Sequence, residues 1–578
     1  MTSTNIRPTD TDSESPPPAE AVAVQPSGAG VSPAPDKRRW AAFVIMTVAT
    51  FLDMLDGSIV NVAIPTIQHD LGASYGAVQW ITAGYVMAFA LMLITGGRLG
   101  DIYGRRKMFL LGVAGFTIAS LLCGIAMNPE MLIASRLLQG AAAGIMVPQV
   151  LSIIHVTFPD NEKGTVFAVH GTVGGIAATV APLIGGVIVA ANIFGWDWRP
   201  IFLVNVPLGV VGFFLGLKYI PESKAPHALR VDLPGVFLAT LGLLLLLTPL
   251  TFGRELGWPA WAFVSMVAGI AVLIAFVAYE RRRSLTNGSP LVALNLFKAR
   301  SFSSALGLML ACFTFTGMFM LALYMYMQLG LGWSALRAGV TLLAFAFGAF
   351  ITASASVIAL VPKFGRTVVQ AGAVGIALGL GLFLWINGSS DGDITSWNIV
   401  PALFVIGLGF GAAATPISLF GLKDVPHEDA GSASGLINTM QQLGFTIGIA
   451  VVSLSFFAPL GSAATSSADE LAPKLRQELV AAGVPAEQLG AATTAYQHCV
   501  NERFGGENAS TEPADCVAPA VRGNEKAVAV VRSYEQQAGA QTFSGAFQFT
   551  LYTGLGFIVV AFLAAGALPR RVSAPGQG

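Results

Sequence analysis

The chain has 578 residues, of which 54% are hydrophobic and only 11% charged, and its mean hydropathy is +0.68. Because soluble globular proteins carry about 25% charged residues, this composition excludes an ordinary soluble enzyme. The 32 Lys and Arg residues balance the 32 Asp and Glu residues. Without a basic excess to neutralise phosphates, we expect no nucleic-acid partner. The composition predicts an all-α membrane protein that crosses the lipid bilayer many times.

Fourteen segments are long and apolar enough to cross a bilayer, with bounds uncertain by about four residues. They follow a Pro- and Ser-rich stretch, residues 1–39, which we expect to be a disordered cytoplasmic tail. A large polar loop at 459–542 separates the last two spans, and a short cytoplasmic tail is expected at 569–578. The spans lie at about 40–62, 79–97, 108–127, 130–151, 165–190, 201–219, 232–252, 259–279, 303–326, 338–360, 367–387, 398–420, 431–458 and 543–567.

The distribution of positive charge orients these spans. With the N-terminus in the cytoplasm, 22 Lys and Arg residues fall in inside segments, 3 in short outside loops and 6 in the long 459–542 loop. Because cytoplasmic loops carry an excess of Lys and Arg, we expect a multi-pass protein of the cell membrane with both termini cytoplasmic. Cys499 and Cys516 then lie outside, where oxidising conditions favour disulfides. We expect them to form a disulfide.

Two pairs of loops have similar sequences, which indicates an internal repeat. Tyr103-Gly104-Arg105 resembles Phe364-Gly365-Arg366, and the Pro-to-Gly stretch at 159–164 resembles that at 426–431. The matches predict a first six-helix half at 40–220 and a second at 303–568, with two inserted spans and their loops at 221–302. Parallel six-helix halves with a site between them are the architecture of alternating-access carriers.

Three charged residues lie deep in predicted spans: Asp53, Asp56 and Arg136. Such residues are costly in a membrane and are functional hypotheses by default. Asp53 and Asp56 are three positions apart, on one face of a helix. We consider them candidate proton-coupling groups, with a pore-lining or paired carboxylate as the alternative for Asp53. His170 is either a packing histidine or a proton carrier.

The loop from Gly97 to Lys107 combines glycines with a fixed charge pattern. Gly97 allows two helices to touch, and Gly104 allows a tight turn. Asp101 can cap a helix end and pair with Arg105 or Arg106, which belong on the cytoplasmic side. Positive-inside anchoring alone would explain the basic residues but neither Asp101 nor the glycines.

This loop resembles the Gly-x-Leu-Ala-Asp-Arg-x-Gly-Arg-Lys loop of the major facilitator superfamily, with Gly100 and Ile102 as departures. Further stretches resemble motifs of its fourteen-helix drug:proton antiporters, and cover most of residues 40–570. In the fifth span, Pro182, Gly185 and Gly186 match the antiporter motif, but alanines replace its first two glycines. The other matching stretches are Leu55–Pro65, Trp80 with Tyr85, Arg136–Gly140, Trp198–Pro207, Gly431–Gly435 and Gln442–Gly444.

The resemblance implies the major facilitator fold, proton coupling through Asp56 and Arg136, and gating by the 97–106 loop. The expected partners are protons and an amphipathic small-molecule substrate, carried by a monomer. Candidate cavity residues are His170, Tyr85, Gln139, Asn205, Phe315 and Gln442.

Other energy sources and chemistries lack their motifs. The sequence has no phosphate-binding Gly-x-x-x-x-Gly-Lys-Ser/Thr loop, no Cys/His cluster with zinc spacing and no nucleophile elbow. We therefore expect no ATP hydrolysis, metal, cofactor or enzymatic activity, and a proton gradient as the energy source. Three functions stay open at this point: a proton-driven exporter of drugs or antibiotics, an importer of the same fold, and a membrane receptor or scaffold that does not transport.

Overall fold

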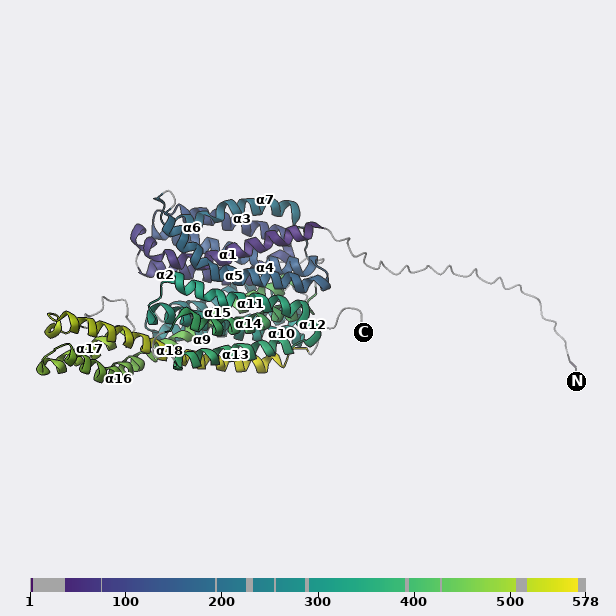
Figure 1. Cartoon of the computed structure of the whole chain (residues 1–578). Coiled ribbons are helices and arrows are strands. Elements are labelled where there is room, and N and C mark those ends of the chain that lie inside the picture. Colours follow the sequence, from purple (N-terminus) through teal and green to yellow (C-terminus); the bar gives the residue numbers. More distant parts are fainter. Residues whose placement is uncertain are drawn as a thin grey trace. The chain divides into compact units, whose positions relative to one another are not determined.

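The computed structural model describes residues 2–3, 37–73, 75–192, 195–224, 232–253, 256–285, 291–389, 394–426, 429–505 and 517–569. Within these ranges all regular structure is helical (Figure 1). The tails expected at 1–39 and 569–578 and Cys516 lie largely or wholly outside them.

The transmembrane helices follow the predicted spans closely. Thirteen helical stretches in the described part of the chain are long and apolar enough to cross a membrane, and α5 corresponds to the remaining predicted span. In the first half they are α1 (Lys37–Leu71), α2 (Tyr75–Tyr103), α3 (Arg105–Gly124), α4 (Pro129–Thr157), α5 (Asp160–Ala191), α6 (Pro200–Leu203) and α7 (Asn205–Tyr219). The inserted pair is α8 (Leu233–Phe252) and α9 (Ala260–Leu285).

The second half begins after a short helix, η2 (Leu294–Lys298). It contains α10 (Arg300–Met325), η3 (Tyr326–Gly330), α11 (Ala335–Ala355), η4 (Ser356–Leu360), α12 (Val361–Phe364), α13 (Thr367–Ser389), α14 (Ser396–Leu422), α15 (Ala430–Val452), η6 (Ser453–Phe457), α16 (Leu460–Ala481), α17 (Ala486–Gly505), η7 (Pro519–Val521) and α18 (Glu525–Ala565).

The two halves repeat the same packing. In the first half α4 packs against α2 and α3, and α3 against α7; in the second half α14 packs against α11 and α13, and α13 against α18. The contacts between halves are also paired, since α2 packs against α15 and α5 against α11. The interface between the halves is thus formed by the second and fifth helices of each half, as expected of two related units.

The repeated loops both turn at a glycine with a positive φ angle, and they have a similar role. Gly104 and Gly365 both have positive φ angles, 110° and 57°, which glycine adopts without steric cost. The guanidinium of Arg106 donates to the Leu217 carbonyl near the end of α7, and that of Arg366 donates to the Gly566 carbonyl after α18. In both halves, an arginine at the start of the third helix (α3 or α13) therefore binds the end of the sixth helix (α7 or α18).

The predicted polar loop is a helical bundle. Residues 430–481 form one nearly continuous helical stretch, and the 41-residue α18 begins well before the predicted span (Figure 1). Buried side chains from three helices form a core here, among them Leu475 of α16, Tyr496 of α17 and Val531 of α18. Because these helices bury their apolar faces against each other, they need no break at the membrane surface.

Cys499 of α17 is disulfide-bonded, whereas Cys123 and Cys312 are free and buried. The pairing of Cys499 with Cys516 stays a prediction, because Cys516 lies outside the described residues. Mass spectrometry of unreduced protein should show this link, and reduction should lower the stability of the bundle by about 3 kcal/mol for a loop of about 17 residues. Two free thiols in freshly isolated protein would rule the link out.

Candidate functional site

The centre of the site is a carboxylate in the middle of the chain's first membrane helix. Asp56 of α1 is fully buried and accepts hydrogen bonds from three side chains. Its Oδ1 accepts from Asn205 Nδ2 at 2.8 Å and Gln139 Nε2 at 3.0 Å, and its Oδ2 pairs with the Arg136 guanidinium. A single charge is thereby held by donors from α4 and α7.

Arg136 is equally enclosed. Its Nε donates to the Ile81 carbonyl at 3.1 Å and its Nη1 to Gln139 Oε1 at 2.8 Å. The guanidinium carbon lies 4.1 Å from the centre of the Tyr85 ring, a cation–π distance. Removing one partner of a buried pair leaves an uncompensated charge, which costs about 3–5 kcal/mol. The pair therefore supports the fold of the first half as well as any coupling role.

Asp53 has a different environment from Asp56, although it lies one helical turn away. It is 4% exposed and accepts a hydrogen bond from the Tyr85 hydroxyl at 2.5 Å. The described contacts of its carboxylate include the neutral Tyr85 hydroxyl and no cation. Tyr85 contacts both groups, because its hydroxyl binds Asp53 while its ring lies against the Arg136 guanidinium.

Ser120 completes this cluster and is the residue that sequence reasoning missed. Its hydroxyl lies 3.1 Å from Gln139 Nε2 and 3.0 Å from Asn205 Nδ2, and it donates to the Phe202 carbonyl. The available signal was a polar residue three positions before Cys123 in the apolar part of this helix. That spacing puts both on one face of α3.

The second part of the site joins the two halves of the protein. Asp101 of α2 is 1% exposed. Its Oδ1 accepts from Arg105 at 2.8 Å and from the Gly431 N–H at 3.0 Å, and its Oδ2 accepts from the Ser432 N–H at 3.1 Å. The carboxylate therefore caps α15 of the opposite half, where the N–H groups of a helix start favour negative charge.

Further contacts close the same region, which we call the Asp101 junction: Arg98 and Asp101 of α2, Ser152 and His155 of α4, and residues 425 and 429–432. The Ser152 hydroxyl donates to the Ala430 carbonyl at 3.3 Å, and His155 Nε2 lies 3.2 Å from the Val425 carbonyl oxygen. Arg98 lies 3.8 Å from Asp429. The two halves are thus closed together at this end.

The glycines of the loop act as expected. A side chain on Gly97 would collide with the Gly431 carbonyl and come within 3.2 Å of the Gly435 Cα. Only glycine allows this approach of α2 to α15. Arg106 differs from the expectation: it contacts the Leu217 carbonyl and, through its N–H, Glu222 Oε1 at 3.2 Å, and the described contacts do not pair it with Asp101.

The antiporter-motif residues of α5 pack against α1. A Cβ on Gly185 would lie 2.6 Å from Ile59 Cγ1, so the two helices touch three residues beyond Asp56. Gly186 is half-buried. Pro182 lies within α5, but its side chain is not among those described.

The predicted cavity residues separate into two groups. Gln139, Asn205 and Tyr85 are enclosed in the acidic cluster, with Gln139 and Asn205 fully buried, instead of lining an open cavity. His170 on α5 and Gln442 on α15 are half-buried and are not joined to that cluster by described contacts. Phe315 is 1% exposed and stacks on Phe319, in the core of the second half.

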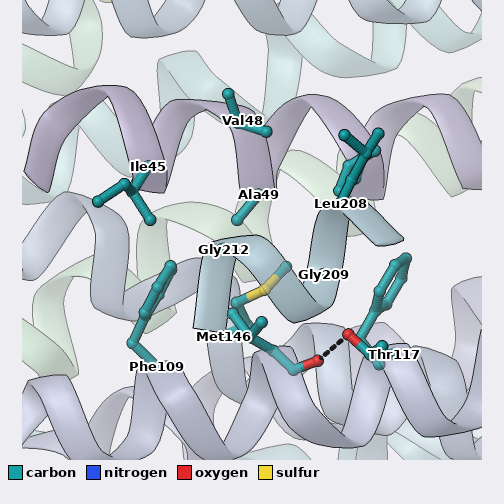
Figure 2. Close-up of a pocket in the computed structure, with 12 residues that line it drawn as sticks. Ile45, Val48, Ala49, Phe109, Thr117, Met146, Leu208, Gly209 and Gly212 are labelled. Carbon is teal, nitrogen blue, oxygen red and sulfur yellow. Dashed lines mark hydrogen bonds between the residues drawn. The ribbon is translucent and has the colours of Figure 1, made fainter. Parts of the chain in front are cut away.

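A small apolar pocket lies between α1, α3, α4 and α7 (Figure 2). Ile45, Val48 and Ala49 line it from α1, and the Thr117 hydroxyl at its edge donates to the Val113 carbonyl at 2.7 Å. Its volume of about 20 Å³ has room for roughly one water molecule, so it is no substrate site.

At the opposite end of the first half, Asp70 of α1 binds two neighbouring residues. Its Oδ2 accepts from Arg199 at 2.6 Å and from Trp198 Nε1 at 3.0 Å. Partial burial acts to raise the pKa of Asp70, but these hydrogen bonds outweigh it and hold the pKa below its usual value.

Asp70→Asn should therefore lower the free energy of unfolding by at most about 1 kcal/mol, as for other half-exposed pairs. A carboxyl group with a lowered folded-state pKa contributes stability above its unfolded pKa, about 3.9, and loses it as the pH falls through the folded value. Denaturation curves of wild type and variant should differ at pH 6 and converge below pH 4. A constant difference across this range would show that Asp70 acts without its charge.

Together these features define a multi-spanning membrane carrier, with two six-helix halves closed at one end and a buried acid–base cluster beside the interface. The chain belongs to the major facilitator superfamily, whose family model matches residues 46–449.

The named relatives agree with this assignment. The chain is 40% identical over 551 residues to a protein named a probable actinorhodin transporter of Streptomyces coelicolor, covering 94% of both chains. It is 33% identical to a cephamycin export protein of Amycolatopsis lactamdurans, covering 75% of this chain and 87% of that one. Among solved structures, the human organic anion transporter MFSD10 has the same fold, with a TM-score of 0.52 and 14% identity, over 73% of this chain and 94% of that one.

Proposed function

We propose that this protein exports amphipathic small molecules, such as antibiotics or drugs, in exchange for protons across the cell membrane. The observation that carries the proposal is the buried acid–base cluster of Asp53, Asp56 and Arg136 in the first half. A charge pair costs several kcal/mol to bury, and intramembrane ionisable groups mark ion pathways. Export as the direction is supported by relatives named as a cephamycin export protein and as a tetracenomycin C resistance and export protein.

We place the Asp101 junction on the cytoplasmic side, because the loops at that end hold most of the Lys and Arg residues. The described state is then closed toward the cytoplasm. Asp53 and Asp56 lie between the junction and the opposite end of α1. Protons and substrate would reach them alternately from the two sides as the halves rock about the interface.

The two acids divide the coupling between them. Asp56 is paired with the positive charge of Arg136 and with two amide donors, contacts that each stabilise a carboxylate. The described contacts of Asp53 give it the neutral Tyr85 hydroxyl and no cation, and a buried acid without a paired cation is the better candidate to carry a proton. We therefore assign the proton to Asp53 in this state. Asp56 then carries the negative charge, which responds when Asp53 gains or loses its proton. Their spacing on one helix face makes them a coupled pair.

A susceptibility panel in a host lacking its own pumps tests export directly. Cells that express the wild-type protein should survive higher concentrations of some amphipathic compounds than cells that express Asp56→Asn. Asp469→Asn, in the polar bundle, is the matched control and should behave as wild type. Accumulation of the same compounds in right-side-out vesicles under a proton gradient would instead identify an importer. Equal survival of wild type and Asp56→Asn across the panel would contradict the proposal.

A further inference from the structure

A second pair of buried acids lies in the inserted helices, outside the cluster described above. Asp232 precedes α8 and is 1% exposed, and Glu280 near the end of α9 is fully buried. Asp232 Oδ1 accepts from the Gly235 N–H at 3.0 Å, which caps α8, and from the Tyr279 hydroxyl at 2.9 Å. Both acids lie at the end of the protein where the Asp101 junction is found.

The two carboxylates face each other across Gly235. Glu280 Oε1 and Asp232 Oδ2 lie 2.6 and 2.7 Å from the position that a Cβ on this glycine would take. The cation that the described contacts place against the pair is Arg283, whose Nε lies 3.1 Å from Asp232 Oδ2. Glu280 Oε1 has no hydrogen-bond partner among the described residues. One cation balances only one of two buried negative charges. The pair therefore has its lowest free energy when the two carboxylates share one proton.

A chain of hydrogen bonds links this pair to the Asp101 junction. Glu280 Oε2 accepts from the Val292 N–H at 3.0 Å. The next N–H, that of Ala293, donates to the Ser432 hydroxyl at 3.3 Å, and the Ser432 N–H donates to Asp101 Oδ2 at 3.1 Å. In addition, α8 packs against both α2 and α15, the helices that meet at the junction.

We propose that Asp232 and Glu280 form a proton-binding site that stabilises the closed Asp101 junction. With one proton bound, Glu280 holds Val292, and the 291–293 segment supports the start of α15. When the proton leaves, the two carboxylates repel each other at low dielectric and this support weakens. The protonated site favours the closed state, so the closed-to-open ratio rises as the pH falls.

Among the described residues, few other groups near the pair could titrate in its place. Tyr279 and Arg283 face the pair from α9, and the 291–298 segment supplies backbone N–H groups. Arg98 and Asp101 of α2, with Asp429, lie beyond Ser432, and His155 of α4 faces the Val425 carbonyl at the same junction. The inference rests on the proposed function for the assignment of this end of the protein to the cytoplasm. An acidic cytoplasm would then favour the closed state of a pump that brings protons into the cell.

The test measures the junction itself, without substrate or a gradient. Spin labels on Tyr103→Cys and Phe364→Cys, which replace exposed residues of the two halves, report the distance between α2 and α12 in lipid nanodiscs. In the wild type the closed-to-open ratio should rise as the pH is lowered, by up to about 10-fold per pH unit for one coupled proton. Glu280→Gln keeps a carbonyl for Val292 and an N–H for Asp232, so it should stay closed with a pH slope well below that of the wild type.

Two further variants make the result decisive. Asp232→Asn retains a good helix cap and should also flatten the profile, even if Glu280→Gln fails to fold. Arg281→Gln, an exposed neighbour on α9, should keep the wild-type slope. A wild-type slope in Glu280→Gln or Asp232→Asn would overturn the inference.

The Asp56→Asn background separates this proton site from the transport site. Any pH slope left in Asp56→Asn should disappear when Glu280→Gln is added. If Asp56→Asn alone removes the slope and Glu280→Gln does not, the inference fails while the proposed function stands. If Glu280→Gln removes the slope and no compound in the panel is exported, the inference stands and the proposed function fails.

Discussion

Asp56→Asn should abolish proton-driven efflux while substrate binding or exchange stays measurable. Asparagine keeps the size and the hydrogen bonds of the carboxylate but cannot carry a charge or titrate. Asp56 is the only acid that the described contacts pair with Arg136, so the variant removes the charge that responds to the proton. Efflux in inside-out vesicles, measured with and without a pH gradient, should fall to the level of passive exchange.

The same variant should also lower the stability of the protein, and the two effects must be separated. Arg136 would be left as a buried charge, at a cost of about 3–5 kcal/mol. Adding Arg136→Gln removes that charge and should restore much of the stability without restoring coupling. If the double variant recovers pH-driven efflux, Asp56 has only a structural role.

Asp53→Asn completes this comparison. Because Asp53 has no cation among its described contacts, this variant should lose coupling without the stability cost of Asp56→Asn. Wild-type efflux by Asp56→Asn together with loss in Asp53→Asn would move the whole coupling role to Asp53.

Asp101→Asn should shift the protein toward states that are open at the Asp101 junction. The carboxylate binds Arg105 and two N–H groups of α15, and these contacts to α15 exist only when the halves are closed. Losing the charge removes charge-assisted hydrogen bonds that stabilise the closed state by about 2 kcal/mol in total. This corresponds to roughly a 30-fold fall in the closed-to-open ratio. Distances between labels at Tyr103 and Phe364 would show the shift.

Substrate affinity should change little in Asp101→Asn, because the junction is far along α2 from Tyr85 and the acidic cluster. Lys107→Gln, on the same loop but without described contacts to the junction, is the matched control. A collapse of affinity with an unchanged distance distribution would show that the gating assignment is wrong.

The sequence by itself determined the order and the approximate positions of the membrane spans. Apolar length is a local property, and a bilayer leaves a chain no alternative to helices, so each predicted span coincides with a helix. The bounds differ most beside the polar bundle, where one helical stretch runs on to Ala481 and α18 already begins at Glu525. The repeated Gly-Arg loops likewise indicated two halves, because glycine at a positive φ angle leaves a readable signature at Gly104 and Gly365. The spacing of Asp53 and Asp56 put both acids on one face of α1.

Only the tertiary structure decided the partners of these groups. The sequence paired Asp101 with a local arginine, but the carboxylate also caps α15, some 330 residues away. It gave both Asp53 and Asp56 as candidate proton-coupling groups, and the packing gives them different partners: Arg136 pairs with Asp56, and the Tyr85 hydroxyl binds Asp53. Compensation of a buried charge depends on which atoms lie within about 3 Å of it. Those atoms come from helices that are distant in the sequence, and the packing of such helices cannot be read from hydropathy or residue spacing.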